Sequence, residues 1–239
     1  MKNNLYKISG SLLLMFVITL TGCESNVTGE GPVMDIKKNV ENFSKLDLQI
    51  DAEVNITQGT TNNLVITAQN NIAEGIYAVV SGGKLKIYSD KNLVTTEPIV
   101  INLTMSSVEA IEISGSGIIK SKGVINAPEL NLKVSGSGEI FFNTVCNSLE
   151  TDISGSGVVH LKGSAIDNKL NIGGSGKLDA FDFATQTTKV EISGSGNADV
   201  TVSQNLTADI SGSGNVNYKG NPAKVKSDVS GNGTIHVAE

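Results

Sequence analysis

The stretch that decides the fold is Glu112–Lys120, EISGSGIIK. Its central quartet, Ser-Gly-Ser-Gly, begins at 114 and returns at 135, 154, 193 and 211, with the variants Gly-Gly-Ser-Gly at 173 and Ser-Gly-Asn-Gly at 230. Successive copies start 18 to 21 residues apart. A flexible Gly/Ser linker has no reason to keep such a period, whereas a chain that stacks one structural unit per turn does. The spacing therefore predicts a repeat architecture.

The residues on both sides of each quartet alternate between apolar and polar types, which is typical of β-strands. The residue directly before the quartet is Ile or Val in all seven copies, and the residue five places after the quartet's first residue is apolar in all seven. Stacking such units every ~4.8 Å gives a parallel β-solenoid whose apolar columns become internal ladders. We therefore predict an all-β, single-chain parallel β-helix of about 19–20 residues per rung, right-handed by the general preference for parallel crossovers. A variable third segment would close each turn, and no part of the mature chain is predicted to be helical.

The quartet itself is interpreted as a corner of the solenoid. Glycine supplies positive φ angles and lets neighbouring backbones approach closely, while serine hydroxyl groups could hydrogen-bond along the stack. These residues are therefore expected to be architectural before they are functional. The corner glycines are Gly115, Gly117, Gly136, Gly138, Gly155, Gly157, Gly174, Gly176, Gly194, Gly196, Gly212, Gly214, Gly231 and Gly233.

The chain before the repeats is also rich in alternating runs, but these keep no period. Turn signals such as QGTTNN (58–63) and SGGK (81–84) separate them. We predict one β-helix domain over 35–239, with irregular first rungs and a cap over 35–110 and regular rungs over 111–239. A separate small β-domain for the first part is the alternative.

The N-terminus has the features of a bacterial lipoprotein signal. Residues 1–22 carry Lys2 and Lys7 followed by the apolar run SLLLMFVITL, which is too short for a comfortable membrane span. Leu20-Thr21-Gly22-Cys23 resembles the lipobox, which implies cleavage before Cys23 and acylation of its thiol. Residues 23–34 would then be the lipidated cysteine and a flexible tether. The protein is expected to be lipid-anchored in the cell envelope, and Glu24 after the cysteine favours the outer membrane; surface and periplasmic faces both remain open.

The whole pattern resembles a known family. Phe43-x-x-Leu46-x-Leu48, then SGGKLKIYS (81–89), then strand-like runs leading into the Ser-Gly-Ser-Gly repeats, are similar to the auto-transporter adhesin head (GIN) domain family. The resemblance covers nearly all of the mature chain. It implies a single-chain β-helix associated with the envelope of bacteria of the Bacteroidetes type, and it supplies no catalytic residues.

Composition argues against several classes of protein. The net charge is −6, and it would become about −8 without Lys2 and Lys7; all 18 basic residues are lysines, so nucleic-acid binding is not expected. His160 and His236 fall four rungs apart in one outward column, too distant to share a metal ion or a catalytic triad, and each is expected to be a solvated surface residue. Cys146 is expected to be a buried apolar filler without a disulfide. The protein is therefore predicted not to be an enzyme, although β-helices can host carbohydrate-active ones.

One outward column is acidic. The residues two places before the quartets include Glu191, Asp209 and Asp228 on consecutive rungs. Like charges at ~5 Å repel each other, so lysines nearby would have to compensate on a solvated face. The alternative is a weak divalent-cation ladder, since oxygen ligands suit Ca²⁺. No other cofactor is expected.

Three functions follow as hypotheses. The first is an adhesion or interaction module that binds an unidentified protein or glycan. The second is a periplasm-facing structural or sensing lipoprotein, and the third is a carbohydrate-active β-helix enzyme. The strand GTIHVAE (233–239) would leave an open solenoid edge, which must be capped or paired because bare edges associate.

Overall fold

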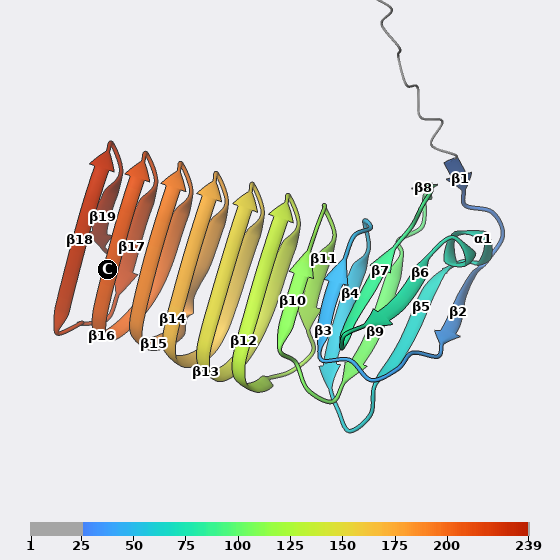
Figure 1. Ribbon diagram of the computed structural model, residues 1–239. Coiled ribbons are helices and arrows are strands. Elements are labelled where there is room, and N and C mark those ends of the chain that lie inside the picture. Colours follow the sequence, from blue (N-terminus) through green and yellow to red (C-terminus); the bar gives the residue numbers. More distant parts are fainter. Residues whose placement is uncertain (1–25, 239) are drawn as a thin grey trace, which may run out of the picture.

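The computed structural model describes residues 26–238, which form a β-solenoid of about seven turns (Figure 1). In the regular part each long strand ends at the second position of a glycine quartet. Parallel neighbours are one repeat apart, so that Ile153 pairs with Ile172 and Ile172 pairs with Ile192. The predicted fold class is confirmed. The long strands are β12 (Ile125–Gly136), β13 (Glu139–Gly155), β14 (Val158–Gly174), β15 (Lys177–Gly194) and β16 (Asn197–Gly212).

Shorter strands extend the stack at both ends of this regular part. β10 (Ala110–Ile113) and β11 (Ile118–Ser121) precede it, and β17 (Asn215–Lys219), β18 (Lys224–Gly231) and β19 (Thr234–Val237) follow it. The residue before each quartet points into the core, and six of the seven are no more than 3% exposed. Each such aliphatic side chain contributes about 1.5–3 kcal/mol on burial, which offsets the ordering entropy of the chain.

Each long strand also bends between two quartets. β13 and β14 pair from Glu139 to Cys146 and again from Ser148 to Gly155, and the ladder is interrupted at Asn147. The variable segment that was expected to close each turn separately is therefore part of the β-ladder. In Figure 1 these bends lie on the side of the solenoid opposite the arrowheads, which mark the quartets.

The two glycines of a quartet are required for different reasons, one for its backbone angle and the other for close packing. The first has a positive φ in every copy, between +116° and +155°. The second lies against the preceding rung: a Cβ on Gly176 would lie 2.9 Å from the carbonyl oxygen of Gly157. Backbone groups connect the corners, as Ser175 N donates to Gly155 O at 2.9 Å. Of the quartet serines within residues 26–238, only Ser114 makes a side-chain hydrogen bond, so the expected hydroxyl ladder is wrong.

The first part of the chain continues the same sheet. β3 (Lys45–Leu48) and β4 (Glu53–Gln58) pair in parallel with β10 and β11, and β7 (Lys84–Tyr88) and β9 (Val100–Met105) pair in parallel with β3 and β4. Three antiparallel strands then end the stack. They are β2 (Val33–Lys38), β5 (Asn63–Gln69) and β6 (Tyr77–Ser81).

Two expectations for this region are wrong. A helix, α1 (Asn70–Glu74), covers the end of the core with Ile72 and Ala73; its five residues are too few to show a helical period in the sequence. Residues 26–35 are not a free tether, because β1 (Asn26–Thr28) pairs with β8 (Asn92–Val94) and β2 begins at Val33. Asn71 Nδ2 donates to Thr28 O at 2.7 Å and fixes this docking. No helix within residues 26–238 is long and apolar enough to cross a membrane.

Candidate functional site

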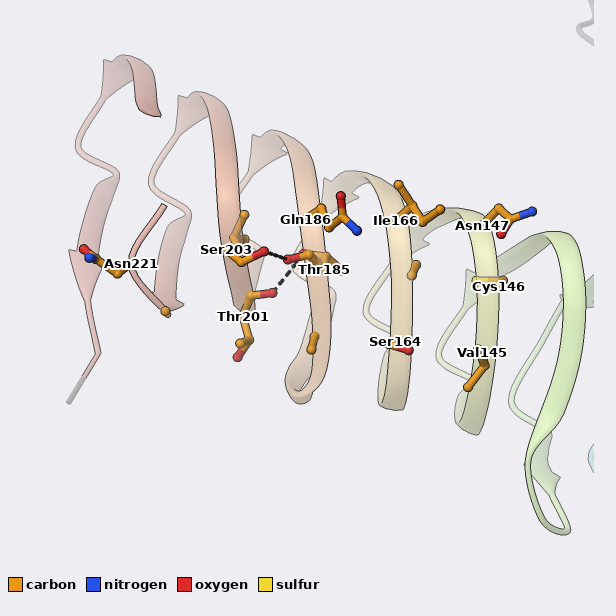
Figure 2. Close-up of a pocket in the computed structure, with 14 residues that line it drawn as sticks. Val145, Cys146, Asn147, Ser164, Ile166, Thr185, Gln186, Thr201, Ser203 and Asn221 are labelled. Carbon is orange, nitrogen blue, oxygen red and sulfur yellow. Dashed lines mark hydrogen bonds between the residues drawn. The ribbon is translucent and has the colours of Figure 1, made fainter. Parts of the chain in front are cut away.

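The main concave site is a groove that runs along the bends of β13 to β16 (Figure 2). It has a volume of about 570 Å³. Because it crosses successive rungs, its long axis follows the solenoid axis. Its lining residues are Val145, Cys146, Asn147, Ser164, Ala165, Ile166, Ala184, Thr185, Gln186, Thr201, Val202, Ser203, Gly220 and Asn221.

Small buried side chains form the floor of the groove. Cys146 pairs with Ala165, Ala165 with Thr185, and Thr185 with Val202, so the floor is a single ladder. All four residues are buried. The floor is therefore one ladder of buried side chains that continues across four successive strands.

The rim combines apolar and amide side chains. Val145 and Ile166 are 46% and 45% exposed and place apolar surface on the rim. The amides of Asn147 and Gln186 also line the groove. Thr185 Oγ1 donates to Thr201 O at 2.8 Å, and Ser203 Oγ donates to Thr185 O at 3.0 Å. These two bonds hold β15 and β16 together where their register shifts.

None of the groove's 14 lining residues is charged, although 18% of the chain is. A charged ligand buried there would lose hydration without gaining an ionic partner. The groove therefore suits an uncharged ligand that combines apolar surface with a few hydrogen-bonding groups.

Cys146 is a free, buried thiol on the groove floor. Burial raises the pKa of this thiol to about 11, and a hydrogen bond with Thr144 opposes the shift only in part. The thiolate is the reactive form of cysteine, so this residue is a poor nucleophile at neutral pH. The prediction of a buried filler is confirmed, whereas Cys23 lies outside the described residues.

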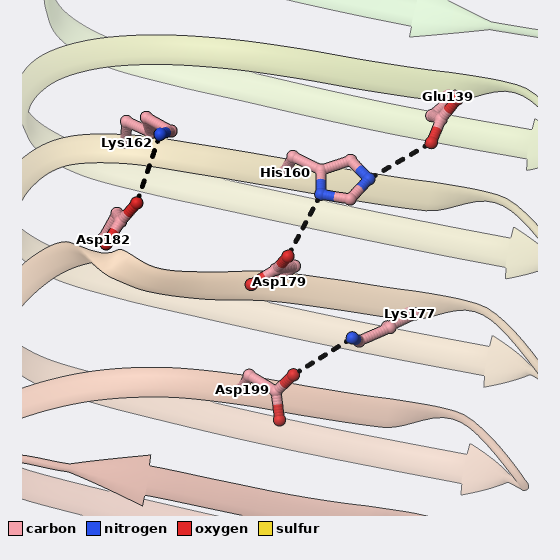
Figure 3. A network of polar contacts seen from close by, with 7 residues as sticks. All are labelled: Glu139, His160, Lys162, Lys177, Asp179, Asp182 and Asp199. Carbon is pink, nitrogen blue, oxygen red and sulfur yellow. Dashed lines mark hydrogen bonds and ion pairs between the residues drawn. The ribbon is translucent and has the colours of Figure 1, made fainter.

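His160 occupies a polar network on another face (Figure 3). Its Nδ1 lies 3.2 Å from Asp179 Oδ2, and its Nε2 lies 3.1 Å from Glu139 Oε1. Its ring stacks on Phe141 with centroids 4.5 Å apart. The expectation of a merely solvated residue is wrong for His160. Reading Phe141, His160 and Asp179 down one column of the repeat could have revealed this network.

The network engages both ring nitrogens of His160 with carboxylates. A general base needs a free nitrogen directed at a substrate, and a triad needs a hydroxyl or thiol within hydrogen-bond reach. Neighbouring charges on this face pair with each other, as Lys177 Nζ lies 3.2 Å from Asp199 Oδ2. The arrangement is that of a structural polar ladder. His236 lies in the same column, as the sequence predicts.

The acidic ladder exists as predicted, because Glu191 pairs with Asp209 and Asp209 pairs with Asp228. However, Lys189 Nζ lies 2.6 Å from Glu191 Oε1, and this hydrogen bond lowers the pKa of Glu191. In the part of the chain that the structure describes, no three His, Cys, Asp or Glu side chains are grouped so that they could hold a metal ion. The calcium ladder stays a prediction.

Glu112, at the head of the same column, is held by two lysines. Lys84 Nζ and Lys133 Nζ each lie 3.1 Å from one of its carboxylate oxygens. Burial alone would raise the pKa of Glu112, but the hydrogen bonds from Lys84 and Lys133 outweigh it and the pKa is lowered. This pair of contacts ties the irregular first rungs to the regular ones.

Four solved structures share this fold over their whole length at 22–24% identity. A "putative adhesin" from Bacteroides fragilis is 22% identical with a TM-score of 0.83, and covers 89% of this chain and 100% of its own. A "putative lipid binding protein" and a "putative adhesin", both from Parabacteroides distasonis, have TM-scores of 0.75 and 0.70 at 22% and 24% identity. Each covers 90% of this chain and 100% of its own. Such identities show the fold alone, and no curated protein matches the chain.

The family model described as "Putative auto-transporter adhesin, head GIN domain" matches residues 42–222. The match begins just before β3 and ends just after β17, so it includes the irregular rungs from β3 onward, the first six of the seven quartets and the groove. The chain therefore belongs to the auto-transporter adhesin head (GIN) domain family, as its repeats and its first strands together predict.

Proposed function

We propose that this protein is a lipid-anchored, non-catalytic β-solenoid of the bacterial cell envelope, and that it acts as an adhesion module through the uncharged groove. The observation that carries the proposal is the groove itself, a hollow of about 570 Å³ without a charged residue on a chain of net charge −6. The adhesin-type family supports an envelope role.

The chemistry of the described residues supports a non-catalytic role. His160 has both ring nitrogens engaged, and the Cys146 thiol is held in its protonated form by burial. The groove offers amides and hydroxyls, which bind and orient a ligand but do not exchange protons readily near neutral pH. Binding without turnover is the activity that such a lining suits best.

The anchor is proposed from Leu20-Thr21-Gly22-Cys23 and from the apolar run before it. Acylated Cys23 would place the chain in the detergent phase of a Triton X-114 extract. Cys23→Ser would move it to the aqueous phase, and Cys146→Ser serves as the matched control that leaves partitioning unchanged. Equal partitioning of the wild type and Cys23→Ser would refute the anchor.

The side of the outer membrane is tested by labelling intact cells with a membrane-impermeant amine reagent. Labelling is preferable to cleavage because residues 26–35 are docked on the solenoid and offer little free chain to a protease. Modification of exposed lysines such as Lys162 in intact cells would support a surface-facing adhesin. Modification only after lysis would favour the periplasmic structural or sensing alternative.

The groove is tested by placing a charge on its rim. Ile166→Lys removes apolar surface at an exposed position and should leave the fold intact, and Val124→Lys is the control at an equally exposed valine outside the groove. We expect the wild type and Val124→Lys to bind ligands on an array of neutral glycans and Ile166→Lys to lose this binding. Equal binding by all three proteins would refute the groove as the contact site.

A second candidate function is the binding of a lipid acyl chain. It is favoured by the floor of Cys146, Ala165 and Val202, and by the structural relative from Parabacteroides distasonis that is described as a lipid binding protein. Binding of the soluble domain to phosphatidylcholine vesicles, lost in Ile166→Lys while the glycan array stays blank, would support this candidate over the first.

A further inference from the structure

β18 is an open edge at the far end of the solenoid (Figure 1). Among the described residues it pairs with β16 alone, and all eight of its residues are exposed. Val225 and Val229 continue the ladders of Leu206 and Ile210, which are buried. They are nevertheless 43% and 40% exposed, because no rung covers them. The edge therefore presents both unpaired backbone groups and apolar core side chains.

The sequence of this edge is complementary to its own reverse. Residues 224–230 read Lys-Val-Lys-Ser-Asp-Val-Ser, with Ser227 at the centre. In an antiparallel pairing about that centre, Val225 faces Val229 of the second copy, and Lys226 faces Asp228 of the second copy. The alternation of strand faces places the valines toward the core and the ion pairs toward solvent. One register thus matches apolar and charged positions together.

The charges on this edge are also free to take a partner. Within residues 26–238, Lys224, Lys226 and Asp228 belong to none of the ion pairs that the chain forms with itself. Several other charged ladder positions are paired across rungs, as Lys177 is with Asp199 and Lys169 is with Glu150. A copy of the same edge supplies the missing opposite charge to Lys226 and to Asp228.

We propose that β18 is a self-association edge, at which two copies of this chain join end to end by antiparallel β18 pairing about a two-fold axis at Ser227. The interface is isologous, so it closes with two copies and does not propagate into a fibre. Each dimer carries two grooves, and two weak contacts on one particle bind more tightly than either alone.

The first test uses the full chain in its native envelope. Ser227→Cys places a thiol on the proposed axis, opposite its own copy, and mild oxidation with copper phenanthroline should give a dimer band that a reductant removes. The wild type controls for the two natural cysteines, and Ser148→Cys controls for a thiol at an exposed mid-solenoid position. Absence of a Ser227→Cys dimer would overturn the proposal.

The second test exchanges the charges in the Ser227→Cys background. Lys226→Asp and Asp228→Lys each turn two cross-strand ion pairs into like-charge pairs, so each should lower the dimer fraction about tenfold. Co-expression of the two variants should restore it, because in the mixed dimer the introduced aspartate faces the introduced lysine and the unchanged Asp228 faces the unchanged Lys226. Lys162→Asp, in a surface ion pair away from the edge, should have no effect. If the dimer fraction did not change with these exchanges, the proposed pairing register would be wrong. If the Ser227→Cys protein stayed monomeric, the proposal would be wrong, and Lys224 and Lys226 would instead protect the edge from association.

Discussion

Alanine substitutions within one glycine quartet test the corner most directly. Positions 173, 174 and 176 are all glycine in the fourth quartet, yet their surroundings differ. A Cβ on Gly173 would meet nothing within 4 Å. A Cβ on Gly176 would meet the Ile153 methyl group and the Gly157 carbonyl oxygen, while a Cβ on Gly174 would lie 2.6 Å from the Gly155 carbonyl oxygen at a φ of +134°.

These differences set an order of stability. Gly173→Ala adds neither strain nor overlap and reduces the entropy of the unfolded chain, so the free energy of unfolding should rise by about 0.4–1 kcal/mol. Gly176→Ala adds overlap alone, at a cost of about 1–3 kcal/mol. Gly174→Ala adds a similar overlap and, in addition, a strained φ that costs about 1–3 kcal/mol. We therefore expect the free energy of unfolding to fall by about 2–6 kcal/mol.

The measurement is denaturation in guanidinium chloride, followed by far-ultraviolet circular dichroism, on the chain without its first 23 residues. Because stacked repeats can unfold in parts, the midpoints are compared before any free energy is extracted. The midpoint should fall in the order Gly173→Ala, Gly176→Ala, Gly174→Ala. If Gly174→Ala matched Gly173→Ala within about 0.5 kcal/mol, the corner would not need glycine and the account of the quartet would be wrong.

Three further outcomes follow from the titratable groups. Glu112→Gln should lower the free energy of unfolding by about 1 kcal/mol at pH 7. Because the pKa of Glu112 is lowered in the folded state, the difference in stability between the wild type and Glu112→Gln should be present above the ordinary pKa of 4.5 and should vanish as the pH falls through the folded-state pKa. Paired melting curves of the two proteins from pH 7 to 3 would check this. Cys146, with a pKa of about 11 against 9.0, should react with maleimide at pH 8 at least about a hundredfold more slowly in the folded than in the unfolded domain, and equal rates would show that the bend opens readily. Millimolar Ca²⁺ should leave the melting temperature unchanged because Lys189 already occupies Glu191, whereas a rise that Asp209→Asn removes would establish the calcium ladder.

The regular rungs could be predicted from the sequence because a stacked fold repeats its constraints. Each quartet packs on the quartet before it, so Gly174 must accommodate the carbonyl oxygen of Gly155, and Gly194 must accommodate that of Gly174. The same applies to the inward isoleucines, which pair with their equivalents one rung away. A constraint that recurs in space recurs in the chain, and period and columns are visible without a structure.

The groove could not be predicted in this way, because its position depends on register shifts. β15 holds residues 181–183 between Ala180 and Ala184, whereas the paired residues of β16, Val200 and Thr201, are adjacent. Phe183 is buried within this insertion. Residues at equal distances from successive quartets are therefore not paired at the bends. The ladder of Cys146, Ala165, Thr185 and Val202 becomes visible only when the strand pairing is known. The short helix α1 and the docking of residues 26–35 were missed for a similar reason, since both depend on tertiary contacts.

The contrast between the two sides of the solenoid indicates where function can lie. On the quartet side, a substitution at a glycine such as Gly174 meets the backbone of the neighbouring rung, so little chemical variation is possible. On the bend side, residues such as Val145 and Ile166 project outward from a ladder that tolerates insertions, so they can change without disturbing the stack. The terminal strand β18 has the same freedom on its outer edge, since it has a neighbour on one side alone among the described strands. A fold whose repeats are fixed by close packing thus leaves its bends and its ends as the surfaces available for recognition, and these are where the groove and the self-complementary edge occur.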